Sequence, residues 1–121
     1  ERKLRHWQSI VAGACEQSGR STLPEVRPPV DLSRFLADSP REGQRLVLSP
    51  GGPASLAGLA SVAAAVELLI GPEGGFDDDE RKALLRLEAV HRIAMGPRIM
   101  RADTAAVAAL ALVNATLGDW R

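Results

Sequence analysis

The chain has 121 residues, in which 15 lysines and arginines balance 15 aspartates and glutamates. This length fits one domain with its own core, so we expect residues 1–121 to form a single domain. The balanced charge excludes a strong overall electrostatic field that would draw the chain onto nucleic acid. Any contact with nucleic acid must therefore be made by a local part of the surface. Lone Cys15 excludes a disulfide framework, and His6 and His91 lack ligand spacing, so we expect no metal.

No apolar run reaches the roughly 20 residues of a membrane-spanning helix, and the charged start lacks the apolar segment of a secretory signal. We therefore expect a soluble, cytoplasmic protein with no membrane partner, and a single cysteine fits that reducing compartment. The chain opens on Glu1 instead of Met, directly within a helical pattern, which indicates that other sequence precedes it.

The first third of the chain predicts two helices joined by a proline-rich piece. Apolar residues recur at helical spacing from Lys3 to Gln17, and we expect this helix to end near Gly19. Residues 23–30 contain Pro24, Pro28 and Pro29 and allow only a short extended piece. Asp31 is placed to cap a short helix through Leu36.

Three units of strand, loop and helix follow. The strands are expected over 45–48, 66–70 and 90–95, and the helices from about Ser55, over 77–87 and over 103–117. Asp77 and Glu80 have the spacing of a capping box. The alternation predicts an α/β fold with a mostly parallel sheet flanked by helices. Ligands bind beyond the carboxyl ends of such strands, so the three Gly/Pro loops should converge on one site.

The second and third loops, 69–76 and 95–104, each combine glycines with a carboxylate. Glycine lets backbone groups approach a ligand closely, and a following helix offers unpaired N–H groups. The loop at 71–75 is not a phosphate loop, because no Lys-Ser or Lys-Thr pair follows its glycines, and it does not have the dinucleotide spacing. Ordinary strand-to-helix turns remain an alternative.

Several charged residues have both a structural and a functional interpretation. Asp103 fits a helix N-cap paired with Arg101, and that role is compatible with catalysis. Residues 17–20 fit a helix end, or a contact with a base and its phosphate. The basic start of the chain fits a solvated helix face or a phosphate-binding surface. We expect Cys15 in the core, and the aromatic residues in the core or an interface: Trp7, Phe35, Phe76 and Trp120.

Taken together, segments 16–20, 69–76 and 95–105 closely resemble the RsmE family, the 16S rRNA uridine-N3 methyltransferases of the SPOUT class. The resemblance covers essentially the whole chain. It implies a SPOUT fold with a deep C-terminal trefoil knot, a homodimer, S-adenosylmethionine as cofactor and 16S rRNA as substrate. Relatives also carry an N-terminal PUA-like RNA-binding domain, which these residues lack, so the chain corresponds to the catalytic domain, with activity on its own in doubt.

The resemblance also implies roles for individual residues. The cofactor pocket would use three loop segments: Leu48, Ser49, Pro50, Ile70, Gly71, Pro72, Glu73, Gly74, Gly75, Met95, Gly96, Ile99, Met100 and Arg101. The catalytic residues would be Arg101, Asp103 and, from a partner subunit, Arg20. RNA would be bound by a further set: Arg5, Gln17, Ser18, Arg20 and Arg98.

Two questions stay open. Asp103 stands where many relatives have glutamate, so its proton-transfer role is less secure than a role in holding arginines. Helix 103–117, with Trp120 beyond it, is either a dimer face or a buried core helix. The alternative functions are a SPOUT ribose 2′-O or tRNA methyltransferase, and a non-catalytic module that binds RNA or a nucleotide.

Overall fold

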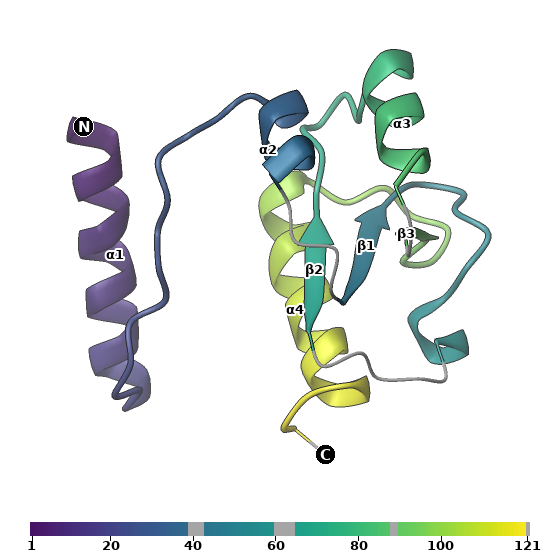
Figure 1. Cartoon of the computed structure of the whole chain (residues 1–121). Coiled ribbons are helices and arrows are strands. Elements are labelled where there is room, and N and C mark those ends of the chain that lie inside the picture. The colour runs from purple at the N-terminus through teal and green to yellow at the C-terminus, as the bar shows by residue number, and fades with distance from the viewer. Residues whose placement is uncertain (39–42, 60–64, 88–89, 121) are drawn as a thin grey trace. The chain divides into compact units, whose positions relative to one another are not determined.

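The computed structural model describes residues 1–38, 43–59, 65–87 and 90–120 (Figure 1). It divides into two compact units, Glu1–Phe35 and Leu36–Arg121. Its elements in chain order are α1 (Arg2–Ser18), α2 (Leu32–Asp38), β1 (Gln44–Leu48), the 3₁₀ turn η1 (Leu56–Gly58), β2 (Val66–Leu69), α3 (Asp78–Leu85), β3 (Val90–Ile93) and α4 (Ala102–Thr116). No helix within these described ranges is long and apolar enough to cross a membrane.

The N-terminal unit is built on α1, which ends as predicted. Gly19 adopts the left-handed conformation, with φ 72°, and its N–H donates to carbonyls of the last turn. The N–H of Arg20 donates to the carbonyl of Cys15 at 2.9 Å. The thiol of Cys15 lies 3.9 Å from the carbonyl oxygen of Thr22, and Cys15 is 6% exposed. The chain therefore turns back at this helix end and buries the cysteine, as expected.

Of the aromatic residues expected in the core or an interface, neither tryptophan lies in the core. Trp7 is 40% exposed and Trp120 is 65% exposed, whereas Phe35 and Phe76 are half-buried. The physical reason is that an apolar side chain on a helix or near a chain end is buried only where another element covers it. An interface role for the two tryptophans stays a prediction.

The C-terminal unit contains a parallel sheet in the order β2-β1-β3, which confirms the predicted α/β class. Central β1 is paired on both sides, so its middle residues are buried and Leu46 is fully so. β2 ends at Leu69 and β3 at Ile93, one and two residues earlier than expected. The chain leaves the sheet there and enters the second and third loops.

The two faces of the sheet are covered by different helices. Leu46 and Ile93 form the core with Leu56, and Val113 of α4 packs against this cluster. Val47 is next to Leu46, so its side chain points to the opposite face, where it lines a pocket with Leu84 of α3. α4 and α3 therefore lie on opposite faces of the sheet. In Figure 1 the loop after β2 leads into α3 and the loop after β3 leads into α4.

Three predictions concern the residues at which helices begin. The capping box at Asp77 and Glu80 is confirmed, because each side chain accepts a bond from the other's backbone N–H. The N-cap role of Asp103 is wrong: Arg101 is the N-cap residue, and Asp103 lies in the first turn. The helix expected from Ser55 is a 3₁₀ turn at Leu56–Gly58, and the rest of that prediction, 60–64, lies outside the described residues.

Candidate functional site

The second loop is a tight, glycine-dependent turn after β2. Gly75 has φ 75°, and its N–H donates to the carbonyl of Pro72 at 2.8 Å. The ring of Phe76 lies against Gly71, where a Cβ would stand only 3.2 Å from two ring carbons. A left-handed residue and a close ring approach both favour glycine, so this part of the sequence is required by the turn itself.

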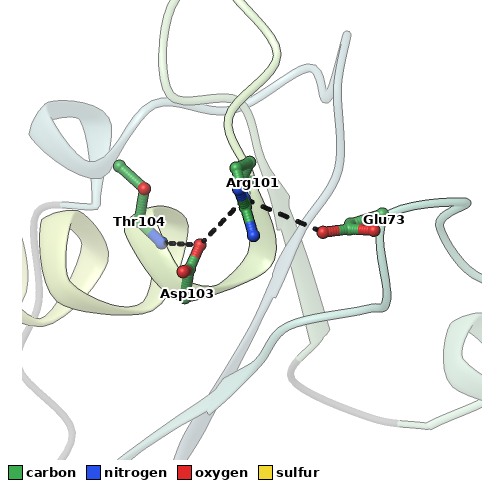
Figure 2. Close-up of polar contacts among 4 residues, drawn as sticks. All are labelled: Glu73, Arg101, Asp103 and Thr104. Carbon is green, nitrogen blue, oxygen red and sulfur yellow. Dashed lines mark hydrogen bonds and ion pairs between the residues drawn. The ribbon is translucent and has the colours of Figure 1, made fainter.

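The third loop carries the charged corner singled out from the sequence. Arg101 Nε lies 3.6 Å from Asp103 Oδ1 and 3.9 Å from Glu73 Oε1 (Figure 2). Asp103 Oδ1 also accepts a bond from the N–H of Thr104 at 2.8 Å. The predicted pairing of Arg101 with Asp103 is confirmed, and Glu73 from the second loop joins it. One guanidinium therefore connects the second and third loops.

All three side chains of this corner are largely solvent-exposed, at 77%, 73% and 74% for Arg101, Glu73 and Asp103. Ion pairs in that setting contribute about 0–1 kcal/mol to folding. The separations of 3.6 and 3.9 Å also exceed hydrogen-bond length, so the five N–H donors of Arg101 stay available to a ligand. The corner is suited to orienting a polar group.

The first loop is hydrogen-bonded to the end of β3. The N–H of Ser49 donates to the carbonyl of Ile93 at 3.0 Å, and Ala54 forms a parallel bridge with Ile93. Gly52 passes so close to this strand that a Cβ would stand 2.9 Å from the carbonyl oxygen of Arg92. The first loop therefore lies beside the strand that leads into the third, as the predicted convergence of the loops requires.

The remaining predicted cofactor residues of the third loop differ in exposure. Met95 and Met100 are half-buried, whereas Ile99 is 81% exposed. Gly96 has φ 82°, and a Cβ there or on Gly74 would meet nothing within 4 Å. Open space beside both glycine backbones leaves room for a ligand to approach the second and third loops.

A pocket opens on the α3 face of the sheet, next to these loops. It is an open hollow with about 480 Å³ of empty space, a volume that includes its mouth. Four predicted cofactor residues line it: Leu48, Ser49, Pro50 and Gly75. The other predicted cofactor residues are not among its lining side chains.

Sequence reasoning missed seven residues that line this pocket: Val47, Phe76, Arg81, Leu84, Leu85, Val90 and Arg92. Alternation along β3 places Val90 and Arg92 on one face, and the pairing of Val47 with Arg92 shows which face it is. The signal in the sequence was the alternation within 90–93. It needed the strand register, which only the structure supplies.

The predicted RNA-binding residues fall in both units. Gln17, Ser18 and Arg20 gather at the end of α1, where Ser18 Oγ donates to the carbonyl of Cys15 at 3.3 Å. Arg5 lies on the same helix about 18 Å from Gln17 along its axis, at 1.5 Å per residue, and its guanidinium is 3.9 Å from Glu1. Arg98 is an exposed residue of the third loop.

Metal-ligating side chains do not cluster in the described ranges, where no group of three or more His, Cys, Asp or Glu residues could hold an ion. The arrangement instead offers backbone groups of three loops, apolar pocket walls and guanidinium groups. These fit an organic ligand that has a flat apolar part and charged ends.

Comparisons with known proteins place this geometry in a class. The RNA methyltransferase domain family matches residues 1–114, so the chain belongs to that family. This confirms the resemblance drawn from the three sequence segments.

Individual relatives are more specific. The chain is 32% identical over 118 residues to ribosomal RNA small subunit methyltransferase E of Buchnera aphidicola, covering 98% of the chain and 48% of that protein. A crystal structure of a ribosomal RNA small subunit methyltransferase E from Neisseria gonorrhoeae, bound to S-adenosylmethionine, matches with a TM-score of 0.92 and 33% identity, over 99% of this chain and 50% of that one.

A methyltransferase from Legionella pneumophila in complex with the same cofactor matches with a TM-score of 0.90 and 37% identity, over 98% of this chain and 48% of that one. The chain thus spans about half the length of the relatives that it matches.

Proposed function

We propose that this chain is the catalytic part of an S-adenosylmethionine-dependent methyltransferase that modifies N3 of a uridine in 16S ribosomal RNA. The observation that carries the proposal is the link between the second and third loops through Arg101, Glu73 and Asp103. It occurs in a chain that matches a cofactor-bound ribosomal RNA small subunit methyltransferase E over 99% of its length. The substrate and the position of methylation follow from that family.

The cofactor would lie against the three loops. Residues 48–50, 70–75 and 95–101 would surround it, mainly through backbone groups, and the open space beside Gly74 and Gly96 supports that fit. When bound, S-adenosylmethionine supplies an electrophilic methyl group on a sulfonium. The residues of this chain would hold the uridine in line with that methyl group.

Arg101 would act on the uracil. N3 of uridine attacks only after or while it loses its proton, so the site must stabilise a developing negative charge. The guanidinium donors of Arg101 suit that task, and Arg20 of the partner subunit would assist. Glu73 and Asp103 would hold Arg101 in place, because both carboxylates lie within 4 Å of its Nε. Either carboxylate could also accept the N3 proton, and the two roles are separated by experiment.

RNA would be held by a local set of basic and polar side chains: Arg5, Gln17, Ser18, Arg20 and Arg98. N3 lies on the Watson–Crick edge, so the target uridine must be unpaired or turned out of its stack. An enzyme that methylates ribosomal RNA would be located in the cytoplasm. Residues 1–121 would form one SPOUT domain with a C-terminal knot.

A second copy of the chain would complete the site. α4 supports this, because Val107 is 70% exposed and Leu110 is 53% exposed on the helix, with Trp120 at 65% just beyond it. Ala109 on the same helix is fully buried in the core. The helix thus combines a core face with exposed apolar residues, and burial of the latter would favour a homodimer.

The experiment is product analysis by mass spectrometry. 16S rRNA lacking the modification is incubated with S-adenosylmethionine and the longer protein that contains this chain, then digested to nucleosides. We expect 3-methyluridine. A 2′-O-methylated nucleoside, or product from tRNA alone, would point to another SPOUT enzyme. Failure of the chain to bind S-adenosylmethionine in calorimetry would favour a non-catalytic module.

A further inference from the structure

The pocket on the α3 face of the sheet contains two arginines that the proposed mechanism does not use. Arg81 comes from α3 and Arg92 from β3, and both line the same hollow. Its walls are otherwise largely apolar, with Val47 and Leu84 buried at 4% and 2% exposure. Two cations thus lie at the edge of a concave, mostly apolar space.

Arg81 reaches toward the second loop. Its Nη2 is 3.8 Å from the point where a Cβ on residue 75 would stand, so the guanidinium lies beside the bare backbone of Gly75. The backbone of Arg81 is fixed in α3, where its N–H donates to the carbonyl of Asp77 at 2.9 Å. The guanidinium therefore comes from a rigid element to the edge of the proposed cofactor site.

Neither arginine has an anionic partner within the described part of the chain, and no ion pair or side-chain hydrogen bond is formed by either. The nearby carboxylates of Asp77 and Glu80 are engaged in the capping box of α3. By contrast, Arg101 has Glu73 and Asp103, and Arg45 has Glu67. The charge of Arg81 and Arg92 is therefore available to an anion from outside the chain.

From this placement we infer that Arg81, with Arg92 as a second cation, binds the carboxylate at the methionine end of the cofactor. The inference rests on the proposed function. A guanidinium offers a planar fork of N–H donors that matches a carboxylate, and the charged pair is stronger than a neutral hydrogen bond. Ser49, Pro50 and Gly75 line the same pocket and belong to the proposed cofactor loops. An RNA phosphate is the less suitable anion, because the arginines line a hollow.

The experiment compares two ligands that differ in the amino-acid end that bears this carboxylate. S-adenosylhomocysteine carries the amino-acid end, whereas 5′-methylthioadenosine has the same nucleoside and thioether without it. Their affinities are measured by calorimetry for the wild-type chain and for Arg81→Met, which keeps the aliphatic stem. Arg81→Lys tests rescue by a conservative change, and Arg86→Ala is the control at the end of the same helix, outside the pocket.

We expect Arg81→Met to weaken S-adenosylhomocysteine roughly 10- to 100-fold, the range of a hydrogen bond to a charged group. The affinity for 5′-methylthioadenosine should stay within about twofold, since that ligand has no group for Arg81 to bind. Arg81→Lys should recover part of the loss, and Arg86→Ala should bind both ligands like the wild type.

Equal weakening of both ligands would overturn the inference, because it would show a structural role for Arg81. Unchanged binding of S-adenosylhomocysteine would overturn it too, and a loss of RNA affinity alone would assign the arginines to RNA. A wild-type chain that binds neither ligand would reject the proposed function itself. The inference and the proposed function therefore fail in different ways.

Discussion

The arginines of the C-terminal unit occupy two contrasting environments. Arg101 lies on an exposed corner between two carboxylates, whereas Arg81 and Arg92 line a hollow without an anionic partner in the described chain. A guanidinium that lies near two carboxylates beyond hydrogen-bond length keeps its N–H donors available, which suits the orientation of a polar substrate. A guanidinium without a partner suits the binding of an anion, which then supplies the missing charge. One residue type thus has two different roles in the proposed site.

The largest expected effect is on the turnover of a variant that lacks the Arg101 guanidinium. In the longer protein that contains this chain, Arg101→Ala should lower kcat about 10²- to 10³-fold, the typical cost of losing one group that stabilises transition-state charge. Its cofactor affinity should stay within a few-fold of the wild type. Single-turnover methylation and calorimetry measure the two quantities. Unchanged turnover would show that Arg101 has no role in methyl transfer. The proposed difference in function between Arg101 and Arg81 would then be wrong.

A smaller effect is expected from the carboxylates that hold Arg101. Glu73→Gln and Asp103→Asn should each lower kcat roughly 3- to 30-fold, because the guanidinium loses part of its support but keeps its charge. The pH dependence of kcat sharpens this prediction. If one carboxylate accepts the N3 proton, its amide variant alone will lose the acidic limb of the profile. If both only position Arg101, both variants will keep the wild-type profile.

The smallest effect is expected on stability. Arg101→Ala and Arg81→Met should each change the free energy of unfolding by less than about 1 kcal/mol, because exposed charges contribute little to folding. Leu46→Ala, in the centre of the sheet, is the reference and should cost about 2–5 kcal/mol. Urea unfolding measures all three. A large loss for either arginine variant would mean that its activity defect comes from the fold.

Sequence reasoning was most accurate where structure is local. The end of α1 at Gly19 and the capping box at Asp77 were both predicted, because each depends on residues within one helical turn. The strand at 44–48 was found from its apolar run, which is typical of a buried central strand. Asp103 shows the limit, because a carboxylate suits an N-cap, yet the backbone placed the cap at Arg101.

Candidate residues were predictable in part. The glycines and charges of the second and third loops stand out in the sequence, but the contact between Glu73 and Arg101 joins segments that only the sheet order brings together. Arg81 and Arg92 fall within a predicted helix and a predicted strand, and the sequence assigned them no role in the site. Their shared pocket depends on the register of β3 against β1.

The sequence by itself determined the approximate positions of most helices and strands and which loops carry glycine and charge, because these depend on short-range hydrogen bonds and side-chain alternation. The tertiary structure alone decided which charges meet, which apolar residues are covered and which arginines lack a carboxylate. These outcomes depend on packing between segments far apart in the chain, and the pairing of parallel strands through crossover connections is what brings those segments together.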